Sequence, residues 1–126
     1  MCRLANHDTL WSKEWHHVCW QWENTHGRWT YFLNGKALIS DHNYAVGTVI
    51  PGLGTFHFGS AGFDYSKVVV SHLDVWSNVL HANEIRRLWK GCTGVEGDVV
   101  QWRGFRNGIN GKITINDRAP CTLPSM

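Results

Sequence analysis

The sequence predicts an all-β domain of antiparallel strands with one short helix near residues 82–90. Three observations support this: eight tryptophans, thirteen glycines, and Asn-Gly pairs at 34–35 and 110–111. Aromatic side chains favour strands, and Asn-Gly favours the tight hairpin turn whose two central residues both have positive φ. A chain of 126 residues is long enough for one domain with one core.

The first strand-like pattern begins at Glu14 and runs into a predicted three-stranded meander. Alternation places Val18, Trp20 and Trp22 on one face, and His17, Cys19 and Gln21 on the other. The turn at 24–27 leads to a returning strand at 28–33, and Asn34-Gly35 leads to its partner at 36–40.

The rest of the chain predicts shorter strands and one helix. We expect strands at 55–58, 67–76, 98–102 and 112–115, and a further short strand within 41–54. Ile85, Leu88 and Trp89 fall on one helical face, and Gly91 ends that helix. We assign five tryptophans to the core, namely Trp15, Trp20, Trp22, Trp76 and Trp102.

Composition excludes several classes of protein. Charged residues make up 17% of the chain and its net charge is +2, which argues against disorder and against a nucleic-acid partner. No apolar stretch approaches the roughly 20 residues of a membrane helix. The four cysteines contain no C-x-x-C pair, so they favour disulfides and an oxidising compartment, with buried cytosolic thiols as the alternative. No signal peptide is visible, so we expect an excerpt from a longer extracellular chain.

Four motifs, in this order, resemble the pentraxin family. The first is Trp15-His16-His17-Val18-Cys19 with Trp22, the Gly27 turn and Asn34-Gly35, and the second is Phe58-Gly59. The third is the strand-to-helix passage from Asp74 through Leu80 to Asn83-Glu84-Ile85. The fourth is Cys92 with the stretch Gly97 to Trp102, as in the branch related to neuronal pentraxins. Laminin-G-like modules share the architecture and are the nearest alternative.

The resemblance implies a jelly-roll β-sandwich of the concanavalin and laminin-G type, with one helix on its surface. Residues 14–121 would form the domain, and residues 122–126 a tail. Residues 1–13 would be a leader or a remnant of a preceding half, because only thirteen residues precede Glu14. We therefore expect the carboxyl half of a pentraxin domain, with a complete, trimmed variant as the alternative.

The resemblance also implies disulfide partners. Cys92 would pair with Cys121, and closing such a loop stabilises a domain by about 3–4 kcal/mol. Cys19 would pair with a cysteine outside this chain or with Cys2, and free thiols are the competing interpretation for both.

Family members hold calcium beside an acidic stretch that follows the Leu-Gly strand end. Here Ser60 and Ala61 stand where Gln and Glu are expected, so Asp64 is the remaining candidate ligand, with Lys67 close in sequence. Calcium takes about six to eight oxygen ligands. We therefore expect no confident cofactor, and at most weak calcium binding at Asp64.

The function that this leaves is recognition or adhesion outside the cell, in a secreted protein or the ectodomain of a membrane protein. The partner would be a glycan or a protein, with no membrane insertion by this segment; self-association stays open. Tyr44 and Tyr65 lie in predicted loops and are the candidate contacts, because aromatic rings anchor interfaces. The alternatives are that both rings pack under their loops, or that the domain is a ligand-free spacer in a mosaic protein.

Catalysis is not expected. Jelly-roll glycosidases, the remote alternative, need two neighbouring carboxylates, whereas Glu84 and Asp74 lie on separate predicted elements. The adjacent His16 and His17 point to opposite faces of a strand, so they cannot share a metal.

Overall fold

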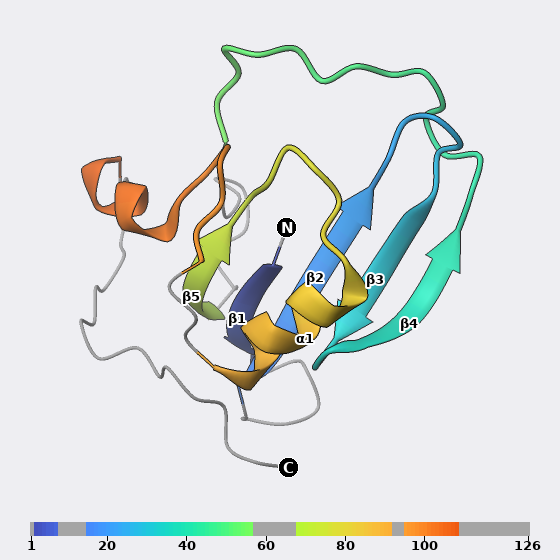
Figure 1. Cartoon of the computed structure of the whole chain (residues 1–126). Helices are drawn as coiled ribbons and strands as arrows, with labels where there is room; N and C mark the ends of the chain where they lie inside the picture. The colour runs from blue at the N-terminus through green and yellow to red at the C-terminus, as the bar shows by residue number, and fades with distance from the viewer. Residues whose placement is uncertain (1, 8–14, 57–67, 92–94, 109–126) are drawn as a thin grey trace.

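The computed structural model describes residues 2–7, 15–56, 68–91 and 95–108, with backbone only for residues 2–7, 68–69 and 106. One five-stranded antiparallel sheet organises this part of the chain, in the order β4-β3-β2-β1-β5, and one helix lies across a face of it (Figure 1). The elements in chain order are β1 Cys2–His7, β2 His16–Trp22, β3 Trp29–Leu33, β4 Lys36–Asp41, β5 Val68–Asp74, α1 Ala82–Lys90 and the 3₁₀ helix η1 Trp102–Asn107.

The β3–β4 hairpin forms where the sequence predicts it. Asn34 and Gly35 have φ of 50° and 79°, and Leu33 pairs with Lys36 across the two-residue turn. The register shifts between Tyr31 and Phe32, which leaves one extra residue in β4. The hairpin prediction is therefore confirmed, and β4 ends one residue later than expected.

Strand β1 was not predicted. No secondary-structure element was expected within residues 1–13, whereas Cys2–His7 pairs with β2 on one side and with β5 on the other. A six-residue strand without regular alternation of apolar and polar side chains gives no periodic signal, and its partner strands supply the hydrogen bonds that define it.

Two other strand predictions are wrong. Residues 42–56 contain no strand, and the predicted strand at 98–102 is reduced to one isolated bridge between Val75 and Val100, followed by η1. The predicted strand at 67–76 is present as β5, and the helix at 82–90 has the expected bounds. Strand 112–115 and the second half of strand 55–58 lie outside the described residues.

The core lies between the sheet and α1. Cys19, Phe32 and Ile85 are buried together, and Trp76, Leu80 and Leu88 pack against them. Cys19 and Phe32 are directly opposite in the β2–β3 register, so both point to the face that α1 covers. Trp20 lies on the opposite face and is 39% exposed, which corrects its assignment to the core.

η1 packs beside β5 through aromatic rings. The ring of Trp102 stacks on His72 at 6.2 Å between centroids and contacts Phe105 at 5.8 Å, and Phe105 meets Phe56 at 6.3 Å. The all-β class with one short α-helix is thus confirmed. The described residues form one sheet. They therefore do not include the second sheet of the predicted sandwich.

Candidate functional site

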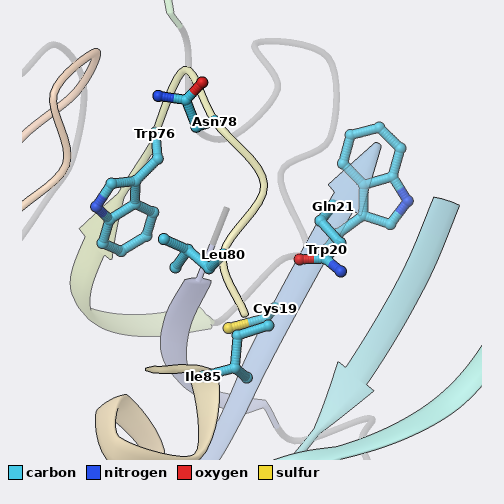
Figure 2. Close-up of a pocket in the computed structure, with 7 residues that line it drawn as sticks. All are labelled: Cys19, Trp20, Gln21, Trp76, Asn78, Leu80 and Ile85. Carbon is cyan, nitrogen blue, oxygen red and sulfur yellow. The ribbon is translucent and has the colours of Figure 1, made fainter. Parts of the chain in front are cut away.

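A small cavity of about 20 Å³ opens between β2 and the segment that links β5 to α1. Figure 2 shows its lining, with Trp76 and Leu80 on one side and Gln21 on the other. The lining residues are Cys19, Trp20, Gln21, Trp76, Asn78, Leu80 and Ile85. None of them carries a charged side chain.

Strand alternation and the path of the chain build this pocket. Cys19 and Gln21 stand two residues apart on β2, so both face the side on which α1 lies. After β5 the chain makes the Val75 bridge and then crosses this face, which brings Trp76 and Leu80 over Cys19.

Gln21 carries the one buried side-chain N or O atom without a hydrogen-bond partner in the described part of the chain. That atom is Oε1. A buried carbonyl oxygen without a donor loses its hydration and gains nothing in exchange. The pocket therefore contains an acceptor that a donor group from outside the chain can satisfy.

The rim of the pocket is fixed by an exposed carboxylate. Asp98 accepts a hydrogen bond from the backbone N–H of Ser77 at 2.7 Å and another from the Ser77 hydroxyl. The hydroxyl bond and then the backbone bond lower the pKa of Asp98, so it is ionised at neutral pH. Because Ser77 lies between Trp76 and Asn78, these bonds hold both lining residues in place.

A second carboxylate, Asp74, anchors the chain that approaches the pocket. Its Oδ1 accepts hydrogen bonds from the backbone N–H groups of Gly97 at 3.0 Å and Trp102 at 3.2 Å. Asp74 is buried, whereas Glu84 is exposed at the start of α1. The two carboxylates considered for a glycosidase thus differ in solvent exposure. The hydrogen bonds of Asp74 connect the end of β5 to the segment that leads into η1.

Tyr44 is the one sequence-predicted ligand contact within the described residues. Its backbone N–H donates to the carbonyl of Gly27 at 3.1 Å, and its own carbonyl accepts from Nε1 of Trp22 at 2.9 Å. The neighbouring Asn43 N–H donates to the carbonyl of His26 at 2.9 Å. The backbone is held on both sides, yet Tyr44 remains 60% exposed.

The turn under Tyr44 is itself organised by Glu23. Its carboxylate accepts backbone hydrogen bonds from Thr25, His26 and Arg28. The bond from Arg28 is the largest cause of a lowered pKa for Glu23. Further along the loop, Gly47 N–H donates to the carbonyl of Asn24 at 2.8 Å.

The segment after Tyr44 exposes several apolar side chains. It arches away from β4 along the top of Figure 1. The exposed residues are Val46, Val49, Ile50, Leu53 and Phe56. Exposed apolar groups that follow one another in this way are typical of surfaces that contact another molecule.

Cys19 and His17 form a buried pair beneath α1. Burial lowers the pKa of His17 from 6.5 to about 4, so the ring is neutral at neutral pH. Its two nitrogens lie 3.9 and 3.8 Å from Sγ of Cys19, which is disulfide-bonded. The β1–β2 register places Cys2 directly opposite Cys19.

The other predicted site residues lie outside the described ranges. These are Asp64, Tyr65, Cys92 and Cys121. Within those ranges, no group of three or more His, Cys, Asp or Glu side chains could hold a metal ion. No helix in the described part is long and apolar enough to cross a membrane. Strand alternation predicts the face on which Gln21 lies but no role for it, because a lone carboxamide belongs to no motif.

Comparison with known proteins identifies the family. A family model described as the Pentaxin family matches residues 4–117. The chain is 30% identical over 113 residues to the Sushi, von Willebrand factor type A, EGF and pentraxin domain-containing protein 1 of Rattus norvegicus, which covers 81% of this chain and 3% of that protein. It is 27% identical over 111 residues to the serum amyloid P-component of Sus scrofa, covering 81% of this chain and 49% of that protein.

A third relative is neuronal pentraxin-2 of Homo sapiens, which is 29% identical over 98 residues. That match covers 71% of this chain and 23% of the relative. The chain therefore spans half or less of the length of each of these relatives. Because the family model covers most of the chain, including β1 from Leu4 onward, the chain belongs to the pentraxin family.

Proposed function

We propose that this chain is a non-enzymatic recognition module of pentraxin type that acts outside the cell and binds a glycan or a protein through its loops. The observation that carries this proposal is Tyr44, whose backbone is held by Gly27 and Trp22 while its side chain remains 60% exposed. An aromatic ring on a fixed backbone loses little conformational entropy on binding, which favours it as an anchor.

The exposed apolar residues that follow Tyr44 extend this surface. Val46 and Val49 lie within five residues of the ring, and both are exposed. A contact of this kind needs no metal ion, and the sequence weakens the acidic stretch around Asp64. We therefore expect binding that is independent of calcium.

Two observations favour a structural role for the carboxylates over a catalytic one. Asp74 is buried and its Oδ1 is engaged by two backbone N–H groups, so it is not available to a substrate. Glu84 lies on a separate element, at the exposed start of α1. Glycoside hydrolysis requires two carboxyl groups that flank one bond.

A glycan array and a panel of purified extracellular-matrix proteins, each probed with calcium and with chelator, test the proposal. We expect binding that survives chelation and falls about tenfold in Tyr44→Ala. His42→Ala, an exposed change in the same loop, is the matched control and should bind as the parent does. Binding that requires calcium would contradict the metal-free interpretation. If the folded parent protein binds no glycan and no protein in either panel, the domain is better explained as a ligand-free spacer.

A further inference from the structure

The pocket beside Gln21 contains a polar group that the chain itself leaves unsatisfied. Oε1 of Gln21 is buried and accepts no hydrogen bond within the described residues. Leaving such a group without a donor costs about 1–3 kcal/mol. An apolar residue at this position would avoid the cost, so Gln21 places a polar group here at the expense of stability.

The size of the pocket restricts what can occupy it. Its volume of about 20 Å³ admits one group as large as a water molecule. A hydroxyl group meets this limit and supplies the donor that Oε1 requires. Whole aromatic rings and branched apolar groups are too large for the interior.

The lining also indicates the charge of the occupant. Cys19, Leu80 and Ile85 are apolar, and the polar side chains among the lining residues are neutral carboxamides. An ionised group would enter this lining without an opposite charge, which is unfavourable. The occupant should therefore be neutral.

The mouth of the pocket offers further contacts for a ligand larger than the hydroxyl itself. Asn78 is exposed at the rim and can both donate and accept hydrogen bonds. The half-buried indole of Trp76 provides an aromatic wall (Figure 2). A sugar ring presents hydroxyl groups at its edge and C–H groups on its face, which match a carboxamide and an indole respectively.

We propose that this pocket is a hydroxyl subsite for a neutral sugar, in which Oε1 of Gln21 accepts a hydrogen bond from one sugar hydroxyl. Asn78 contacts the sugar at the rim, and Trp76 packs beside its ring. The hydrogen bonds between Asp98 and Ser77 preorganise this rim. The subsite rests on the proposed recognition function but uses none of the Tyr44 loop, so either site can fail without the other.

Saturation-transfer difference NMR tests the subsite, with glucose, galactose, mannose and N-acetylglucosamine as separate probes at millimolar concentration. We expect transfer to at least one of these sugars, with affinity reduced about tenfold or more in Gln21→Leu. Asn78→Ala changes an exposed rim residue and should also weaken transfer. Arg86→Ala, an exposed change on α1 outside the pocket lining, is the matched control and should leave transfer at this subsite unchanged.

The same variants provide the result that would overturn the subsite. Gln21→Leu should fold at least as stably as the parent, because it removes an unsatisfied buried oxygen. If the parent shows no transfer to any of the four sugars, or if Gln21→Leu and Asn78→Ala bind as the parent does, the pocket holds only water. If the sugar subsite fails in this way but Tyr44→Ala still loses binding on the glycan array, recognition through the Tyr44 loop remains supported.

Discussion

Gly35 lies directly against the indole ring of Trp89. A β-carbon at Gly35 would stand 2.7 Å from Cε3 of that ring, closer than atoms in contact can approach. The tip of the β3–β4 hairpin thus packs under the last turn of α1, and Gly35 is required there for space as well as for its φ of 79°.

Gly35→Ala should therefore destabilise the domain by about 2–4 kcal/mol, from backbone strain and from displacement of Trp89. Gly47→Ala separates the two causes. Gly47 has nearly the same φ, 77°, but a β-carbon there meets nothing within 4 Å, so we expect a loss of only about 1 kcal/mol. Urea unfolding of both variants measures the difference, and equal losses would contradict the contact with Trp89.

Asp74→Ala should destabilise the domain by about 2–3 kcal/mol, because it leaves the buried N–H of Gly97 and the partly buried N–H of Trp102 without an acceptor. Both bonds end on the same oxygen, Oδ1. Asp74→Asn keeps a side-chain carbonyl oxygen that can accept both hydrogen bonds. Its loss of unfolding free energy should therefore be less than half that of Asp74→Ala. Thermal unfolding at neutral pH compares the two, and an asparagine variant as unstable as the alanine variant would show that the negative charge is what matters.

The free energy of unfolding should fall with acid because of His17. Folding lowers the pKa of this ring from 6.5 to about 4, so between these values the unfolded chain binds the extra proton. Stability from this group is complete above pH 6.5, decreases as the pH falls towards 4, and levels off below it, a total of about 3 kcal/mol.

His17→Leu should flatten this part of the stability profile, whereas His42→Gln, at an exposed position, should not. Chemical denaturation at closely spaced pH values from neutral to acid gives the profile. The same slope in the parent and in His17→Leu would assign the acid sensitivity to other groups.

A disulfide between Cys2 and Cys19 is expected from the register. Directly opposed residues of an antiparallel pair have α-carbons about 4.5–5.5 Å apart, within the range that a disulfide spans. Peptide mapping of the unreduced protein should recover this linkage. Cys2→Ala, Cys19→Ala and the double variant should each lose about 3 kcal/mol, without additivity. Linkage of Cys19 to any other cysteine, in this chain or another, would contradict the pairing.

Local signals predicted the parts of the fold that depend on local chemistry. Asn34-Gly35 specifies its turn through the φ values that these two residues tolerate. Ile85 and Leu88 fix the face of α1 that enters the core. Both features follow from residues close together in the chain, so a single sequence contains the necessary information.

The features that the sequence did not predict depend on distant partners. β1 is defined by its hydrogen bonds to β2 and β5, and in the described part of the chain the expected strand at 98–102 is reduced to one bridge between Val100 and Val75. The site shows the same division. Tyr44 was predicted as a candidate contact from its place in a loop, and its role stays a prediction. The role proposed for Gln21 depends on an unsatisfied oxygen that only the assembled pocket reveals.

The position of β1 between β2 and β5 has a consequence for the order of folding. β2, β3 and β4 are joined by short turns and can pair while the chain emerges from the ribosome, whereas β5 reaches the sheet only by pairing with β1. The edge of β1 that faces β5 therefore stays without that partner until residue 74 has been synthesised. During this interval that edge is open to pairing with another chain, so a chaperone that covers the edge, or rapid pairing with β5, would raise the yield of folded protein.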